Sequence, residues 1–197
     1  MKIHDISQAL LKCRIYPGDN RPERIIIKNM DKGDSYNLSE LHCCVHNGTH
    51  VDAPRHFIKN GKGIDEIEIG KFVGKCFVQS HHGIITENDA KEIYEKAVAH
   101  SIEASRKLLI KGDVEISLAA AKYFAQQNID LLGNESQTIG PVNAPMATHL
   151  ALLEKEVVLL EGIDLSNVND GVYLLNCAPI NIEGCDGSLC RAILIEE

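Results

Sequence analysis

The sequence predicts an α/β protein with a single domain, residues 1–197, in which a mixed β-sheet forms the core and helices flank it. From residue 72 onward, short apolar runs of strand length alternate with longer segments of helical periodicity. The length suits one domain with a sizeable core, and no repeat, linker or low-complexity segment interrupts it. A hydrophobic content of 44% and a charged content of 24% are ordinary for a globular protein.

The first part of the chain is predicted to be mainly extended. Residues 1–7 alternate in polarity and are expected to form a strand, and residues 15–19 form a turn in which Pro17 fixes φ. Residues 24–30 contain three consecutive isoleucines, which favours a strand. Residues 36–45 are predicted as another strand, which leads into a histidine-rich stretch.

Helices and strands alternate in the rest of the chain. Thr86-Glu-Asn-Asp89 has the form of a capping box and opens a predicted helix that runs to about residue 100. Ser117 is expected to cap a second helix, which runs to about residue 127. The remaining predictions are a loop with a short amphipathic piece at 58–70, strands at 72–79, 106–111, 129–132, 157–160, 171–176 and 192–196, an ordered loop at 134–145, and a short helix at 146–153.

Residues 46–57 contain four metal-ligand side chains at even separations: His46, His50, Asp52 and His56. Side chains of an extended chain alternate between two faces, so even spacing can direct all four to one side. A helix would also align the first two, but Gly48 and Pro54 disfavour it. An extended segment with a turn at Asn47-Gly48 is therefore expected. Imidazole and carboxylate groups are ligands of zinc, manganese and iron in open sites.

A histidine-rich surface loop with one structural histidine is the alternative interpretation, because nine histidines in 197 residues make some clustering common. Four ligand-type residues of one parity, held by glycine and proline, favour the metal site. His42 shares this parity but precedes the stretch, and we interpret it as a bystander. His81 and His82 are adjacent, so their side chains point to opposite faces of an extended chain and are interpreted as ordinary polar residues.

Composition limits the partners. Twenty-eight acidic residues against twenty basic ones give a net charge of −8, which argues against nucleic acid or an anionic membrane as partner. The sequence has no run of 18 apolar residues and no signal-peptide layout, so a cytoplasmic protein is expected. Seven cysteines, with Cys43 and Cys44 adjacent and no C-x-x-C pair, are interpreted as reduced thiols rather than a zinc finger.

The stretch 46–57 resembles the HxGTHxDxPxHF signature of the metal-dependent cyclase/formamidase family, which includes bacterial kynurenine formamidase (arylformamidase), and it matches every fixed position. The resemblance extends along most of the chain, from Ile3-His-Asp-Ile-Ser7 to the segment 187–195. It implies a metal-dependent hydrolase domain, and it suggests a homodimer or larger homo-oligomer acting on a small-molecule substrate.

The resemblance also implies the rest of the site. A later histidine and, twelve residues on, a glutamate complete the family's metal cluster, and His149 and Glu161 stand at that spacing. Two divalent ions are then expected, zinc or alternatively manganese. His46, His50 and Asp52 would hold one ion, while Asp52, His149 and Glu161 would hold the other. His56 would stay uncoordinated as the catalytic acid/base, since an imidazole can exchange protons near neutral pH.

The expected reaction is hydrolysis of N-formyl-L-kynurenine to L-kynurenine and formate. The alternatives are the same chemistry on another amide, a cyclic imide or a lactone, and a non-catalytic metal-binding protein, which would have no need of His56. A structural zinc site is disfavoured because such sites are usually closed and rich in cysteine. One departure concerns the substrate: Tyr16 stands where the formamidases place a substrate-contacting tryptophan, and the chain has no tryptophan. The region 111–117 is also shorter than in longer relatives.

Overall fold

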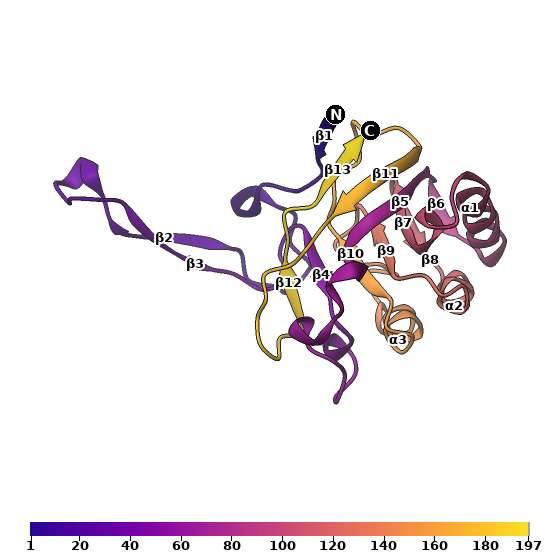
Figure 1. Ribbon diagram of the computed structural model, residues 1–197. Helices are drawn as coiled ribbons and strands as arrows, with labels where there is room; N and C mark the ends of the chain where they lie inside the picture. The colour runs from indigo at the N-terminus through magenta and orange to yellow at the C-terminus, as the bar shows by residue number, and fades with distance from the viewer. Residues whose placement is uncertain (197) are drawn as a thin grey trace.

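A nine-stranded mixed β-sheet organises the fold (Figure 1). The computed structural model describes residues 1–196. The four central strands β5, β7, β9 and β10 run parallel, and the strands on both sides of them pair antiparallel. In spatial order the strands are β1 (Lys2–Asp5), β13 (Ile193–Glu196), β11 (Gly171–Asn176), β5 (Val73–Ser80), β7 (Lys107–Lys111), β9 (Leu131–Asn134), β10 (Val158–Glu161), β4 (His50–Asp52) and β12 (Gly187–Leu189).

Three helices cover one face of the parallel strands: α1 (Glu87–His100), α2 (Leu118–Gln126) and α3 (Met146–Leu153) (Figure 1). The capping box of α1 is present, because the Asp89 amide donates to the Thr86 hydroxyl and the Thr86 amide donates to the Asp89 carboxylate. Ser117 caps α2 by accepting from the Ala120 amide. Phe77, Leu108 and Phe124 are among the buried residues that fill the layer between helices and sheet.

The opposite face of the sheet curls around a second core. Ser7, just after β1, forms a bridge with Ile163, just after β10, although β1 and β10 lie far apart in the strand order. The Asp164 amide donates to the Ile6 carbonyl oxygen at 2.8 Å. Val51, Leu160 and other apolar residues are buried inside the curl. The curl therefore brings the N-terminal segment to the carboxyl end of β10, where ligands gather in α/β sheets.

A hairpin arm, which we define as residues 23–42, projects away from this body (Figure 1). Its strands β2 (Glu23–Lys28) and β3 (Leu38–His42) pair antiparallel with each other only, and every residue in both is exposed. The Asn29 amide donates to the Asp34 carboxylate near the tip of the arm. A smaller parallel pair, β6 (Gly83–Ile85) and β8 (Val114–Ile116), lies beside the main sheet.

Most predicted elements are present, with three differences. The strand predicted at 36–45 ends at His42, because the chain leaves the arm there and turns at residues 45–49. The stretch 46–57 is extended only at 50–52, since Gly48 adopts a φ of +60° in the expected turn and Pro54 opens a short 3₁₀ turn. The strands β6, β8 and β12 were not predicted, because three residues hold too little alternation to be recognised. None of the helices within residues 1–196 is long and apolar enough to cross a membrane.

Candidate active site

Strand β4 places two of the predicted ligands in the middle of the site. It lies between β10 and β12, and its register sets His50 opposite Glu161 and Asp52 opposite Gly187. Because β4 runs antiparallel to β10, the histidine-rich stretch reaches the carboxyl end of the parallel strands. His149 enters the same space from α3, where it is buried.

The five predicted metal ligands come together around two carboxylates. Nε2 of His50 lies 3.3 Å from a Glu161 oxygen, and Nε2 of His149 lies 3.1 Å from the other one. His46 Nδ1 lies 2.9 Å from Asp52 Oδ1, and His149 Nε2 lies 3.6 Å from Asp52 Oδ2. The ligand atoms form two groups, His46–His50–Asp52 and Asp52–His149–Glu161, each with all its atoms within 4.8 Å of one another. Asp52 is the member that the two groups share.

An outer acceptor orients each of the three imidazoles. His50 Nδ1 donates to the Gly48 carbonyl at 3.0 Å, and His149 Nδ1 donates to the Pro145 carbonyl at 2.9 Å. His46 uses its other nitrogen, so that Nε2 donates to the Asp186 carboxylate at 2.8 Å. In each case the second ring nitrogen turns toward the central carboxylates. Outer hydrogen bonds of this kind fix the tautomer of metal-binding histidines.

The charge balance at the centre favours a cation. Asp52 and Glu161 are buried, and the ion pairs they make within residues 1–196 are with histidines alone. Burial disfavours the Asp52 carboxylate, but the adjacent His46 holds its pKa well below the usual value. Burial likewise opposes the His46 cation, yet Asp52 and Asp186 raise the pKa of His46 to about 11. Without metal, the centre must hold protonated histidines to neutralise its carboxylates.

An unpaired carboxylate oxygen at the centre indicates that this donor set fits a metal ion. Asp52 Oδ2 is buried and has no hydrogen-bond partner among the described residues. A buried, unpaired carboxylate oxygen is costly, so a ligand that occupies it would remove a penalty already present in the fold. A divalent cation between Asp52 and the surrounding imidazoles satisfies this requirement.

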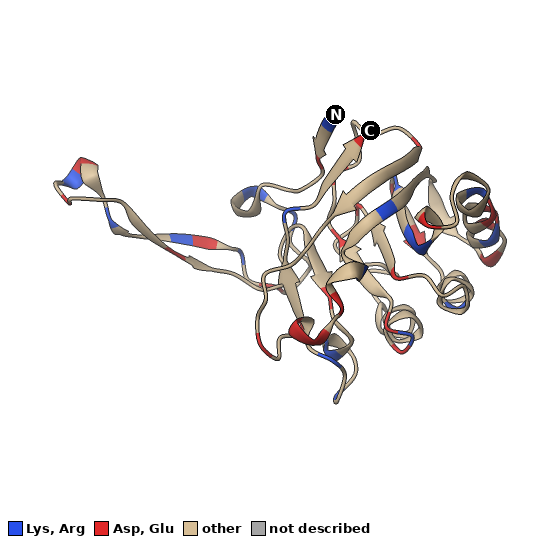
Figure 2. Cartoon of the chain, in the orientation of Figure 1, with Lys and Arg blue, Asp and Glu red and all other residues tan. Residues whose placement is uncertain are grey.

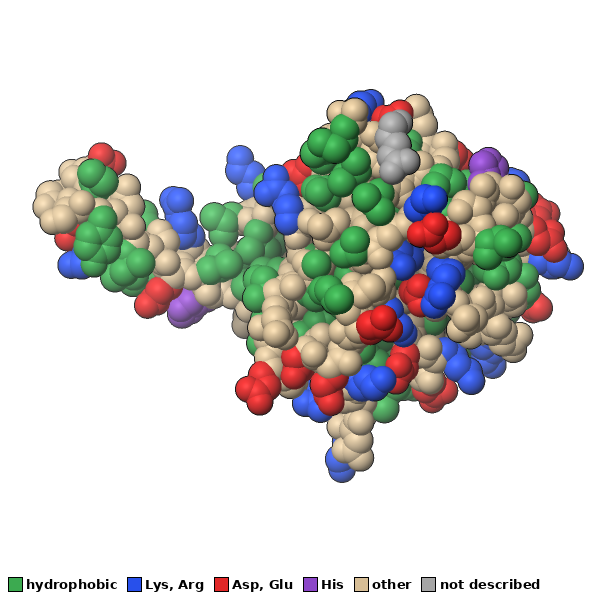
Figure 3. All heavy atoms as spheres, viewed as in Figure 1, with side chains coloured by type: hydrophobic (Ala, Val, Ile, Leu, Met, Phe, Trp, Pro, Cys, Tyr) green, Lys and Arg blue, Asp and Glu red, His purple; other side chains and the backbone are tan. Residues whose placement is uncertain are grey.

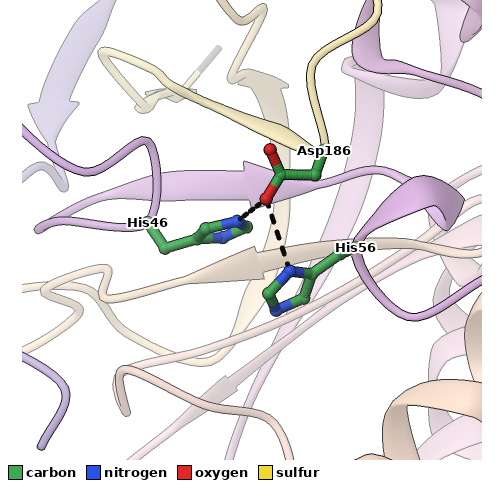
Figure 4. A group of neighbouring side chains, drawn as sticks. All are labelled: His46, His56 and Asp186. Carbon is green, nitrogen blue, oxygen red and sulfur yellow. Dashed lines mark hydrogen bonds and ion pairs between the residues drawn. The ribbon is translucent and has the colours of Figure 1, made fainter. Parts of the chain in front are cut away.

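His56 lies beside this centre, not within it. It ends the 3₁₀ turn Pro54–His56, and its ring lies 4.0 Å from the ring of His46, centroid to centroid. Figure 4 shows both rings directed at Asp186, with His56 Nδ1 3.6 Å from the carboxylate oxygen that His46 contacts. Burial lowers the pKa of His56, which keeps the imidazole neutral near pH 7.

Asp186 is a site residue that the sequence reasoning missed. It immediately precedes β12, and the only sequence signal for it was its position just before the similar C-terminal segment. The flanking Gly187 is also required here, because a Cβ atom on it would lie only 2.7 Å from Cε1 of His46. Asp186, His46 and His56 form a third group with metal-ligand spacing.

A cavity of about 200 Å³ opens onto the centre. Tyr16, the predicted substrate-contacting residue, lies on its wall, and the Tyr16 hydroxyl donates to the Val142 carbonyl at 2.7 Å. Phe57 and Thr138 also line the cavity and were not predicted. The Thr138 hydroxyl is buried and has no hydrogen-bond partner in the described part of the chain.

The other conspicuous residues stay outside the site. His42 is exposed on the arm and lies 3.6 Å from Glu40. Neither His81 nor His82 belongs to any metal-capable group found among residues 1–196. Cys43 and Cys44 are half-buried at the base of the arm, and all seven cysteines are free thiols.

Comparisons with known proteins agree with this geometry. A kynurenine formamidase from Erythrobacter litoralis is 30% identical over 99% of this chain and 94% of its own length. The structure of a predicted metal-dependent hydrolase from Bacillus stearothermophilus superimposes with a TM-score of 0.78 at 25% identity, covering 98% of this chain and 97% of the other. An isatin hydrolase bound to the product analogue thioisatinate has a TM-score of 0.84 at 18% identity, covering 100% and 93%, which establishes a common fold. The family described as "Putative cyclase" matches residues 4–168, and the chain therefore belongs to this family.

Proposed function

We propose that the protein is a metal-dependent hydrolase of carbon–nitrogen bonds, and most concretely that it converts N-formyl-L-kynurenine to L-kynurenine and formate. The observation that carries this proposal is the pairing of a shared-carboxylate donor set with the neutral His56 at one small cavity. The relative from Erythrobacter litoralis, similar over nearly the whole chain, is a kynurenine formamidase and supports the choice of reaction.

We propose that each chain binds two divalent ions, which are zinc or alternatively manganese. His46, His50 and Asp52 would hold one ion, and Asp52, His149 and Glu161 the other. Such ions supply Lewis acidity, which polarises a carbonyl oxygen and lowers the pKa of water toward neutrality. The metal-binding residues contribute orientation, since the Gly48, Pro145 and Asp186 acceptors hold the three imidazoles in fixed positions.

His56 is proposed to move the proton. Its neutral imidazole accepts a proton from the water that adds to the formyl carbon. It then returns this proton to the aryl amine nitrogen as the carbon–nitrogen bond breaks and formate is released. Asp186 lies 3.6 Å from His56 Nδ1 and accepts from His46, so it would hold the two rings in register and would act as a positioning residue.

The cavity suits a small aryl substrate. Its volume of about 200 Å³ is below the ~300–1,000 Å³ of sites that hold drug-sized ligands. Tyr16 and Phe57 offer aromatic surface to such a substrate. Other amides, cyclic imides and lactones of similar size are the second candidate substrates, because the same proton transfers would open them.

The test is a panel of formylated aryl amines, cyclic imides and lactones, each assayed for hydrolysis with added zinc or manganese. The proposal expects the fastest turnover, measured as kcat/KM, on N-formyl-L-kynurenine and other aryl formamides. A higher kcat/KM on an imide or lactone would change the proposed substrate but would retain the proposed hydrolytic mechanism. Full metal binding without turnover of any panel member would contradict the enzymatic proposal in favour of a metal-binding protein.

We expect Tyr16→Ala to raise KM for an aryl formamide, because loss of aromatic stacking costs about 0.5–1.5 kcal/mol. Tyr16→Trp should preserve or improve the activity, since tryptophan offers a larger stacking face. Steady-state kinetics of the two variants, compared with the wild type on aryl and alkyl formamides, checks this. Wild-type kinetics in both variants would remove Tyr16 from the substrate site.

We expect Asp186→Asn to weaken metal binding by roughly 10–100-fold, as loss of an outer partner of a metal-binding histidine does. At saturating metal, kcat should still be reduced with KM little changed, because His56 would lose its neighbouring carboxylate. Asp186→Glu should restore part of kcat. The matched control is Glu183→Gln, an exposed carboxylate of the same loop. Equal kinetics in Asp186→Asn and this control would show that Asp186 positions nothing.

We also propose that the protein acts in the cytoplasm and as a homodimer or larger homo-oligomer. Seven free thiols suit a reducing compartment. The net charge of −8 disfavours nucleic acid and anionic membranes as partners. The large hydrophobic side chains that the hairpin arm exposes support self-association.

A further inference from the structure

His46, His56 and Asp186 converge at the outer side of the proposed metal centre (Figure 4). One oxygen of the Asp186 carboxylate, Oδ2, lies 2.8 Å from His46 Nε2 and 3.6 Å from His56 Nδ1. Two ligand atoms of one tetrahedral zinc ion lie roughly 3.3 Å apart, because each bond is about 2.0–2.2 Å long. The separation of His56 Nδ1 and Asp186 Oδ2 therefore suits a metal ion held between them.

Backbone hydrogen bonds hold these two side chains close together. The Ala53 amide donates to the Asp186 carbonyl oxygen at 2.9 Å, and the Ala53 carbonyl oxygen accepts from the His56 amide at 3.0 Å. The Ile64 amide donates to the Cys185 carbonyl oxygen at 2.8 Å. Because the segment 185–186 is tied to two neighbouring segments, an ion would bind here without ordering a loop, and the entropic cost of binding is small.

Solvent reaches this pair of side chains. The Asp186 side chain is 44% exposed and that of His56 is 28% exposed, whereas that of Asp52 at the centre is 1% exposed. The Cys185 thiol donates to Asp186 Oδ1, with 3.6 Å between sulfur and oxygen, so Oδ2 is the oxygen that faces the two imidazoles. An ion can therefore enter and leave this place while the buried central ligands stay covered.

The surrounding surface is acidic. Glu183 lies in the loop before β12, and Asp65 and Glu66 lie in the short turn Ile64–Glu66 beside it (Figure 2). Figure 3 shows acidic side chains gathered over this edge of the body, at the lower left of the view. Arg55 offsets one of these charges by pairing with Glu66 at 3.7 Å. The remaining carboxylates raise the local concentration of cations.

We propose that a third divalent ion, zinc in particular, binds between His56 Nδ1 and Asp186 Oδ2 when metal is in excess, and that it inhibits hydrolysis. His46 Nδ1 faces Asp52, and His46 Nε2 carries the proton that it donates to Asp186, so water completes the coordination of this ion. With two protein ligands instead of three, and with two cations nearby, the third ion is held more weakly than the proposed central ions. The central sites therefore fill first.

The third ion inhibits through the proposed proton-transfer residue. A neutral imidazole has a lone pair on only one of its two ring nitrogens. An ion on His56 Nδ1 occupies that lone pair and keeps the proton on Nε2, so the ring cannot accept a second proton from water. The inhibition rests on the proposed function, in which His56 exchanges this proton, whereas the binding site rests on the geometry alone.

Equilibrium dialysis of the full chain against increasing zinc tests the site without any measurement of activity. The wild type should bind about two ions tightly and about one more weakly, and His56→Asn should lose the weak ion while keeping the tight ones. His82→Asn, which removes an exposed histidine elsewhere, should retain the weak ion. Cys185→Ala should retain it too, because the thiol contacts the other oxygen of Asp186. A weak ion that persists in His56→Asn, or that is lost in either control, would overturn the site.

Hydrolysis of an aryl formamide by the wild type, measured over the same zinc series, tests the inhibition. Activity should rise as the central sites fill and then fall by roughly 10²-fold or more as the weak ion saturates, as for a lost acid/base. Manganese at the same concentrations should inhibit much less, because it binds such ligands more weakly than zinc. Constant activity while the weak ion binds would overturn the inhibition. A wild type that hydrolyses nothing would refute the proposed function, and the dialysis would still decide the site.

Discussion

Asp52→Ala should remove most of both proposed ions, because Asp52 is the one residue shared by the two groups of proposed metal ligands. The loss in affinity should exceed the roughly 10–100-fold that follows removal of an outer hydrogen-bond partner. Metal analysis after gentle dialysis should give more than one equivalent per chain for the wild type and much less for the variant. Asp113→Ala, which removes an exposed carboxylate, serves as the control.

Full occupancy in Asp52→Ala would show that the carboxylate does not bridge two ions. Retention of one ion would instead assign Asp52 to a single group, and His149→Ala would then identify which group persists. The substitution also removes the 2.9 Å contact between Asp52 Oδ1 and His46 Nδ1, so the metal analysis requires a variant that is shown to be folded. Circular dichroism on the metal-free wild type and variant checks this condition.

His56→Asn should leave both ions in place and lower kcat by roughly 10²–10⁴-fold, the usual range for loss of a general acid or base. His56 faces the cavity and lies beside the two buried groups that share Asp52. An amide side chain can keep a contact with Asp186 but cannot exchange a proton near neutral pH. Metal content and single-substrate kinetics, measured on the same preparation, separate the two effects.

His82→Asn is the control for this experiment, since His82 is exposed and remote from the proposed ligands. The competing possibility is specific, because His56 also forms a metal-capable group with His46 and Asp186. Loss of metal in proportion to loss of activity in His56→Asn would favour that group and would make His56 a ligand.

The candidate site was predictable to different extents in its different parts. His46, His50, Asp52 and His56 lie within eleven residues, so their spacing alone indicated a shared site. The expected extended geometry was only partly correct: His50 and Asp52 share strand β4, whereas His46 and His56 lie in turns before and after this strand.

Proposed ligands that are distant in the sequence could not be found from local patterns. His149 and Glu161 were identified only through the family spacing. The pairing of β4 with β10 brings Glu161 to His50, and neither segment contains a sequence pattern that predicts this pairing. Asp186 was not predicted, because one aspartate between Cys185 and Gly187 carries no periodic signal. The helices were predicted well, since their capping residues act locally on the backbone amides.

The strands of the hairpin arm also have a pairing that local sequence patterns could not predict. Both of its strands were predicted, and the three consecutive isoleucines were a correct indication of extended structure. Alternation and β-branching do not specify which strand is the partner, or whether the chain itself covers the apolar face. That these strands pair with each other outside the main sheet became clear only from the structure.

The strand order has a consequence for how the chain is synthesised. Strand β4 carries His50 and Asp52, and it can pair with its neighbours β10 and β12 only after residues 158–161 and 187–189 have been translated. In the same way, β1 can pair with β13 only after residues 193–196 have been translated. Contacts this distant in sequence form slowly, because loop closure precedes any stabilising contact. A nascent chain on the ribosome should therefore hold no metal until nearly all of it has emerged, and metal loading should be among the last steps of maturation.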